Sequence, residues 1–154
     1  MKKLKEIFIS ILIPNLFGVF GSIIGNAKSF KDMIKPNFAP PAIVFPIVWG
    51  ILYTIMGISS YIIYKSDNAN KEKAFLFYII QLFVNSLWTF FFFALKWYLF
   101  AFIWLLLLII LVIIMIIEFH KINKVAAYLQ VPYLFWLIFA SILNYSIYSL
   151  NVVG

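Results

Sequence analysis

Charged residues are rare in this sequence, and they divide it into long stretches that are almost wholly apolar. Only 11% of the residues are charged, while 66% are hydrophobic; a soluble domain usually carries about 25% charged residues. A helix needs about 20 mostly apolar residues to cross a bilayer core. Five stretches come close to that length or exceed it, at residues 7–25, 45–64, 74–95, 97–117 and 125–150. The sequence therefore predicts an all-α membrane protein in which residues 1–154 form a single domain, a bundle of five transmembrane helices.

The scarcity of reactive side chains excludes several kinds of site. The chain has no cysteine, and its single histidine is His120. Disulfides, thiolate chemistry and a conventional metal site are therefore excluded, and we expect neither a metal nor a cofactor. Coupled transporters usually carry an acid or base in mid-membrane. Glu6 and Glu118 both stand at span ends, which argues against ion- or proton-coupled transport.

The basic residues are all lysines, and most of them flank the predicted spans. This pattern is typical of membrane topology, and nothing in it resembles the basic stripe of a nucleic-acid-binding protein. Eight of the twelve lysines fall on the side of the N-terminus, so the positive-inside rule predicts a cytoplasmic N-terminus and an external C-terminus. No clear small-residue cleavage site follows Lys2, Lys3 and Lys5, so we expect a retained first span rather than a signal peptide.

Polar and aromatic residues recur at helical spacing in three of the spans. In the third span, Gln81, Asn85, Trp88 and Thr89 share one helical face. The second span has a similar face, formed by Pro46, Trp49, Tyr53 and Gly57. The fifth span has another, formed by Pro132, Trp136, Ala140 and Asn144. Such faces would suit a large, flat, mostly apolar ligand, with rings stacked on it and a few donors that fix its orientation.

A purely structural interpretation of the same faces stays open. Amide side chains hydrogen-bond between helices, and tryptophans gather at membrane interfaces. Gly21 and Gly25 form one GxxxG in the first span; it favours close helix packing, with dimerisation as the alternative.

Three segments resemble the TspO/MBR family of tryptophan-rich sensory and translocator proteins. The stretch "KPNFAPPAIVFPIVWGILYTIMGISSYIIY" resembles the first loop and second helix of the family. "NSLWTFFFF" at 85–93 resembles its third-helix motif, and "PYLFWLIFASILNYSIYSLN" at 132–151 resembles its fifth helix. The resemblance covers residues 30–151, in the same order as in the family.

This resemblance implies a five-helix bundle, often a homodimer, in a multi-pass membrane protein such as those of bacterial cell membranes. It further implies a cavity under the first loop, with that loop as a lid, and a ligand of the protoporphyrin IX type or another flat apolar small molecule. The positions carried over by motif as ligand-binding or cavity-lining are Phe38, Pro41, Trp49, Tyr53, Asn85, Trp88, Trp136, Ala140 and Asn144.

The chain departs from the family pattern in the first loop, which usually reads W-Y-x-x-L-x-K-P-S-W-x-P-P. Ser29 and Phe38 replace its two tryptophans, and Phe30 replaces the tyrosine. Some relatives degrade porphyrin in light, and an indole is oxidised more readily than a phenyl ring. The departures therefore argue against such an activity here. The C-terminal sterol pattern L/V-x-Y-x-K/R is also incomplete, so we expect no specialised sterol binding.

Three functions follow from these observations. The first is a tetrapyrrole-binding receptor or sensor with a part in porphyrin transport or homeostasis. The second is an enzyme that degrades porphyrin in light, which the loop sequence disfavours. The third is a small uncoupled transporter of hydrophobic ligands.

Overall fold

The computed structural model describes residues 1–154 as an all-helical bundle. The long helices are α1 (Lys2–Gly25), α2 (Val44–Lys65), α3 (Lys71–Thr89), α4 (Tyr98–Ile122) and α6 (Val131–Tyr148), and α6 is preceded by the short α5 (Lys124–Leu129). A 3₁₀ helix, η1 (Ala27–Asp32), lies in the first loop. Two π-helical turns, η2 (Phe90–Ala94) and η3 (Ser149–Val153), extend α3 and α6. Five continuous helical segments are long and apolar enough to cross a membrane, the last running from Lys124 to Val153.

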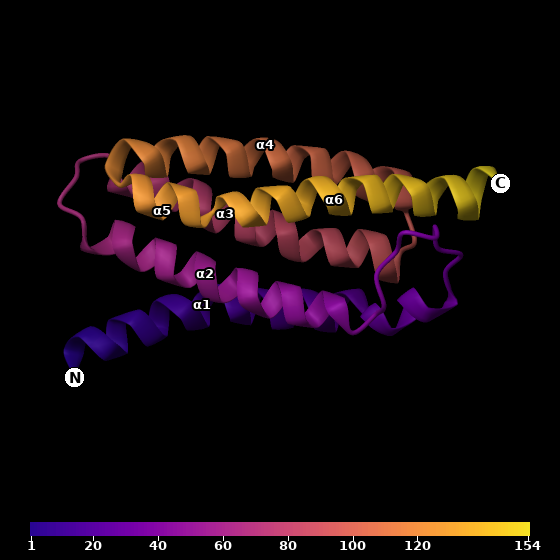
Figure 1. Ribbon diagram of the computed structural model, residues 1–154, viewed down its shortest axis with the longest axis horizontal. Coiled ribbons are helices and arrows are strands. Elements are labelled where there is room, and N and C mark those ends of the chain that lie inside the picture. The colour runs from indigo at the N-terminus through magenta and orange to yellow at the C-terminus, as the bar shows by residue number, and fades with distance from the viewer.

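The spans lie roughly side by side along the long axis, with the two termini at opposite ends (Figure 1). Helix α1 packs against α2 and α3, and α4 packs against both α3 and α6. Helix α2 meets α5 at the N-terminal end of the molecule but makes little contact with α6. Helices α2 and α6 are therefore separated toward the end that holds the first loop.

Local sequence explains where the helices stop. Asn26 ends α1 in a left-handed backbone conformation, and Lys96 adopts a similar conformation in the tight connection to α4; asparagine tolerates that conformation better than most residues. The fifth span is interrupted at Gln130, just before Pro132. Proline has no N–H to donate to the carbonyl group four residues earlier, and its ring clashes with that group inside a helix; Pro132 therefore suits the first turn of a new helix, and α5 and α6 form separate helices.

Glycines let the first two spans approach closely. A β-carbon at Gly57 of α2 would collide with the backbone of Ser10 and Ile11 in α1. Gly25 sits equally tightly against α3, where a β-carbon would lie 2.8 Å from the Thr89 carbonyl oxygen. Thr89 Oγ1 also donates a hydrogen bond to the Gly21 carbonyl oxygen, at 2.6 Å. The GxxxG of the first span thus packs within the chain, against α3.

The main core fills the end of the bundle that holds the N-terminus. Helix α4 contributes one buried stripe to it, with Leu105, Leu108, Val112, Met115 and Phe119 each nearly inaccessible. No residue of α4 lines the large cavity described below. The large cavity therefore lies away from α4, in the half of the bundle near the first loop.

Candidate ligand-binding cavity

A cavity of about 540 Å³ lies in the half of the bundle that holds the first loop. Helices α1, α2, α3 and α6 surround it, and residues at both ends of the first loop close one end. Its walls are mainly aromatic and aliphatic. Its lining includes Asn15, Gly18, Val19, Ser22, Lys28, Phe30, Phe45, Trp49, Gly50, Tyr53, Asn85, Trp88, Thr89, Trp136, Ala140 and Asn144.

Seven of the nine predicted site residues line this cavity, and two do not. The second, third and fifth spans supply the seven: Trp49, Tyr53, Asn85, Trp88, Trp136, Ala140 and Asn144. Phe38 and Pro41 lie outside the cavity, and both are exposed. The Phe38 ring packs edge-on against Phe139 of α6 instead, with 6.4 Å between the ring centroids. The binding role of all nine residues stays a prediction.

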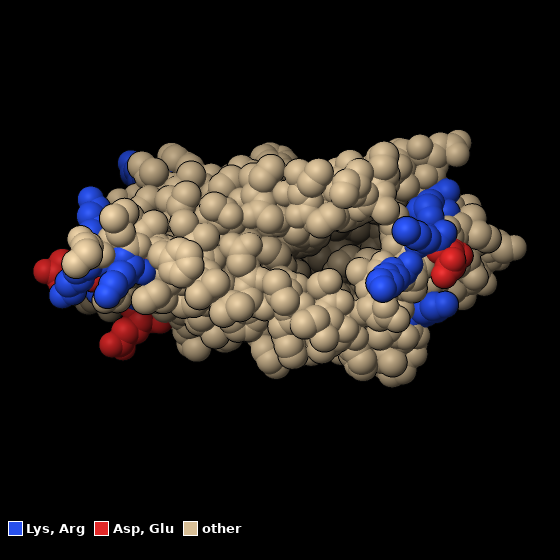
Figure 2. Space-filling model, turned by 90° about the horizontal axis from the view of Figure 1, so that it is seen from below, with Lys and Arg blue, Asp and Glu red and all other residues tan.

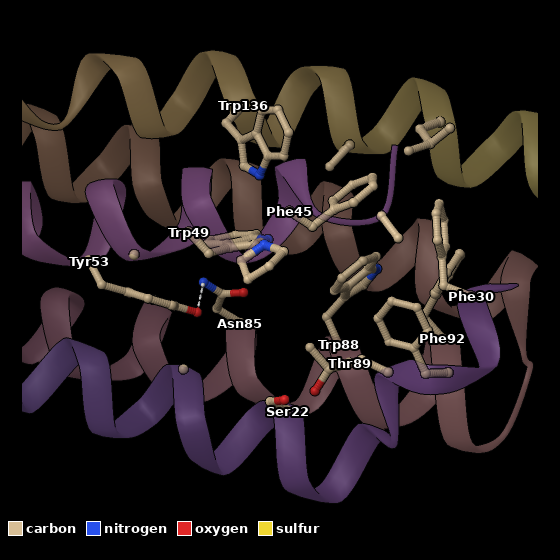
Figure 3. A pocket seen from close by; sticks show the side chains of 18 of the residues that line it. Ser22, Phe30, Phe45, Trp49, Tyr53, Asn85, Trp88, Thr89, Phe92 and Trp136 are labelled. Carbon is tan, nitrogen blue, oxygen red and sulfur yellow. Dashed lines mark hydrogen bonds between the residues drawn. The ribbon is translucent and has the colours of Figure 1, made fainter. Parts of the chain in front are cut away.

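Two indole rings that line the cavity contact each other edge to face (Figure 3). Trp49 of α2 and Trp136 of α6 lie nearly perpendicular, with their centroids 6.5 Å apart. Tyr53 stacks on Trp49 at 5.3 Å, and Phe45 meets the edge of Trp136 at 5.9 Å. Because α2 and α6 hardly touch by their backbones, these rings are the main link between the two helices at this level.

Trp136 carries an unused hydrogen-bond donor. Its Nε1 atom is buried and has no partner in the protein, and Figure 3 shows it pointing from α6 toward Trp49. A buried donor without a partner is costly, and such groups are uncommon in folded proteins. Trp136 therefore keeps an unpaired donor in the wall of the cavity, beside Trp49.

Asn85 links the cavity to a buried polar network. Its amide nitrogen donates hydrogen bonds to the hydroxyl oxygens of Tyr133 at 3.0 Å and Tyr53 at 3.4 Å. The Tyr133 hydroxyl in turn donates to Gln81 Oε1 at 2.7 Å. The Asn85 side-chain oxygen points away from Tyr53, into the cavity (Figure 3). This residue thus holds three helices together and also offers an acceptor to a ligand.

Trp88 and Asn144 are engaged with each other. The Trp88 indole N–H donates to Asn144 Oδ1 at 3.1 Å, and the Asn144 amide donates to the Tyr98 carbonyl oxygen at 2.8 Å. These bonds join α3, α4 and α6, so the polar atoms of both residues are already satisfied. The polar groups of Trp88 and Asn144 therefore bridge helices, as the structural interpretation expects. The Trp88 ring still forms part of the cavity wall.

The sequence analysis missed the first span as a wall of the cavity. Asn15, Gly18, Val19 and Ser22 all line it. Their spacing of i, i+3, i+4 and i+7 is that of one helical face, and the small or polar members interrupt an otherwise apolar helix. That pattern is the signal that could have identified this wall.

The first loop covers the cavity with Phe30 rather than with Phe38. The Phe30 ring is buried against Phe45, 5.0 Å away between centroids. Asn151 fixes the loop: its amide donates to the Ile34 carbonyl oxygen at 2.8 Å and its oxygen accepts from the Ile34 N–H at 3.1 Å. The loop is therefore tied to the end of the fifth span. That contact joins residues 117 positions apart in the sequence.

Lys28 is the only lysine, acid or histidine that lines the cavity. No group of three or more His, Cys, Asp or Glu side chains lies close enough to hold a metal ion. The cavity can therefore enclose a large apolar surface and offer a few neutral hydrogen-bonding groups, with one positive charge in its wall.

Comparison with known proteins supports the same architecture. The sequence model of the TspO/MBR family matches residues 10–150. The chain belongs to the TspO/MBR family. It is 33% identical to the tryptophan-rich protein TspO of Archaeoglobus fulgidus over 149 residues, covering 97% of each chain. It is 32% identical to bovine translocator protein over 148 residues, which are 92% of this chain and 88% of the relative.

Human translocator protein is similar to a comparable degree. It is 35% identical over 146 residues, which are 91% of this chain and 86% of the human protein. Membership of the TspO/MBR family and the five apolar helices together establish a multi-pass membrane protein. The predicted family and fold class are confirmed.

Proposed function

We propose that this TspO/MBR protein is a membrane receptor or sensor that binds a tetrapyrrole of the protoporphyrin IX type and takes part in porphyrin transport or homeostasis. The observation that carries the proposal is the pair of indoles, Trp49 and Trp136, which contact each other edge to face and together line one part of the cavity. Aromatic rings prefer offset or edge-on contacts with other rings, and a flat macrocycle offers two large faces for them.

Three neutral polar groups around the cavity would orient such a ligand. The unpartnered Trp136 N–H supplies a donor, and the Asn85 oxygen supplies an acceptor. Ser22 of α1 adds a hydroxyl on the opposite wall. A few placed polar groups in a mostly apolar pocket are typical of small-molecule sites. The names of the relatives, translocator protein and tryptophan-rich protein TspO, are consistent with this proposal and name no ligand.

A spectral titration of purified protein with protoporphyrin IX tests the proposal. Trp136→Phe keeps a ring in place and removes the N–H, so we expect an affinity about 3- to 10-fold lower, the value of one hydrogen bond. Trp49→Ala removes a stacking surface, and we expect a loss of about 10-fold or more. Trp97→Phe is the control, because Trp97 is exposed and lies outside the cavity.

The titration would contradict the proposal in two ways. If wild-type protein does not bind protoporphyrin IX above the detergent background, the proposed function is wrong. Binding that falls equally in the Trp97 control and in the cavity variants would place the porphyrin on the lipid-facing surface instead.

Light-dependent porphyrin degradation is a second candidate, because two oxidisable indoles lie within the same cavity. An illuminated sample should then bleach the porphyrin faster than detergent alone and yield one product, and Trp136→Phe should slow it. Unchanged bleaching in that variant counts against an enzyme. An uncoupled transporter of hydrophobic ligands would instead move porphyrin across vesicles without bleaching it.

We also propose a location, an orientation and an assembly. We place the protein in a bacterial cell membrane, and the lysine distribution favours an orientation with the N-terminus in the cytoplasm. A homodimer would need a surface other than Gly21 and Gly25, because α3 covers them. Cross-linking in native membranes, before any detergent is added, would detect such a dimer.

A further inference from the structure

The cavity has a side opening between α1 and α2. These two helices touch closely near Gly57 and again where Gly18 meets the Tyr53 ring. A β-carbon at Gly50, two turns nearer the first loop, would meet nothing within 4 Å. Figure 2, which views the molecule from the side of α1 and α2, shows a hollow at this end of the bundle. The cavity can therefore be reached from the side.

The surface around this opening is apolar on the side of the bundle centre and basic on the side of the first loop. Val19 and Ile23 of α1 are exposed, and so are Ile47 and Ile51 of α2. Lysine side chains gather at the other edge of the hollow (Figure 2). A bilayer would cover the apolar part, and the basic part would lie near its surface.

Of the first-loop lysines Lys28, Lys31 and Lys35, only Lys28 lines the cavity. It follows the end of α1, within η1, and is exposed. The three ion pairs of the protein join Lys65 to Glu6, and Lys73 and Lys121 to Glu118. Lys28 takes part in none of them. The Lys35 ammonium, by contrast, donates to the Phe30 carbonyl oxygen at 2.9 Å. Lys28 is thus a cation without an anionic partner, at the entrance of an otherwise uncharged cavity.

We propose that Lys28 binds a carboxylate of the ligand at this entrance, so that the site selects flat apolar acids over neutral molecules of the same shape. The inference rests on the proposed function and adds the ligand's charge to it. The apolar plane lies against the aromatic wall of the cavity, and the acid group stays at the entrance, where it remains hydrated and pairs with the ammonium. An exposed pair of this kind contributes modestly, and salt weakens it.

Protoporphyrin IX and its dimethyl ester test this inference, because they share one ring system and differ in charge. We expect wild-type protein to bind the free acid about 2- to 5-fold more tightly than the diester at low salt. Lys28→Gln should abolish that preference by weakening the acid alone, and Lys28→Arg should keep it. Lys31→Gln is the matched control, since Lys31 lies in the same 3₁₀ helix and does not line the cavity.

Each result has one meaning. A preference that is lost in Lys28→Gln, kept in Lys31→Gln and reduced by 0.5 M salt supports the inference. Equal wild-type affinities for acid and diester overturn it, and so does an equal loss in both lysine variants. If both porphyrins bind equally and Trp136→Phe weakens both, the carboxylate contact fails while the proposed function stands. If neither binds wild-type protein, both fail.

Discussion

Two buried glutamines show how differently the same residue can be used. Gln81 accepts a hydrogen bond from the Tyr133 hydroxyl through Oε1, while its Nε2 has no partner. Gln130, at the break in the fifth span, is equally buried, and neither its oxygen nor its nitrogen has a partner. A buried amide stabilises a fold only when it is hydrogen-bonded, and it is costly otherwise. The two glutamines should therefore respond in opposite ways to the same substitution.

We expect Gln81→Met to lower the free energy of unfolding by about 1–3 kcal/mol, because the Tyr133 hydroxyl proton loses its acceptor in a buried site. Gln130→Met should be neutral or raise it by about 1 kcal/mol, because it removes two unpaired polar atoms and keeps a similar volume. Thermal unfolding of the purified variants in one detergent measures the difference. Equal losses in both would mean that Gln130 is hydrogen-bonded in solution, for example to a buried water molecule.

At the scale of single elements, α2 changes character along its length. Near Gly57 it lies against the α1 backbone, while near Gly50 it faces open space. The same substitution seven residues apart therefore probes the packed and the open halves of one helix.

We expect Gly57→Ala to destabilise the protein by about 1–3 kcal/mol, since its methyl group would overlap the α1 backbone. Gly50→Ala should stabilise it by about 0.5–1 kcal/mol, the usual advantage of alanine over glycine in a helix. Melting temperatures of the two variants give the test. A stable Gly57→Ala protein would show that α1 can move away from α2.

The five spans were predictable because a bilayer imposes a minimum length on any crossing helix. The predicted 45–64 and the observed Val44–Lys65 agree closely, since lysine and proline mark those ends. The first span begins earlier than predicted, at Lys2, because lysines extend a helix readily outside the hydrocarbon core. The break at Gln130 was harder to predict from the sequence. Pro132 predicts either a kink or a helix start there, and only packing against neighbouring helices decides between the two.

At the scale of the whole molecule, lysines mark both ends of the bundle (Figure 2). The orientation can be measured directly because the chain has no cysteine of its own. Asn37 in the first loop and Ala69 between α2 and α3 are both exposed and lie at opposite ends.

We expect Asn37→Cys to react with a membrane-impermeant maleimide on intact cells. Ala69→Cys should react only after the membrane is opened. The reason is the excess of lysines at the end that holds the N-terminus, which favours the cytoplasmic side. The reverse pattern would overturn the orientation, and labelling of both residues in intact cells would indicate two orientations in one membrane.

The cavity was predictable from three of its four walls. Helical spacing alone predicted that Trp49, Asn85 and Trp136 each lie on a polar and aromatic face of their helix, and in the fold these three faces line one cavity. The contacts of the first loop were harder to predict, because a loop lacks the regular residue spacing of a helix. Whether Phe30 or Phe38 turns inward depends on contacts such as that between Ile34 and Asn151, which no local pattern reveals.

The side opening between α1 and α2 also determines which concentration of ligand the protein responds to. A molecule that enters from the flank of the bundle is taken from the lipid phase, so site occupancy follows its mole fraction in the bilayer. Adding empty vesicles would dilute such a ligand and lower occupancy, although its total amount in the sample is unchanged. An apparent dissociation constant for this protein therefore has a meaning only together with the ratio of lipid to protein at which it was measured.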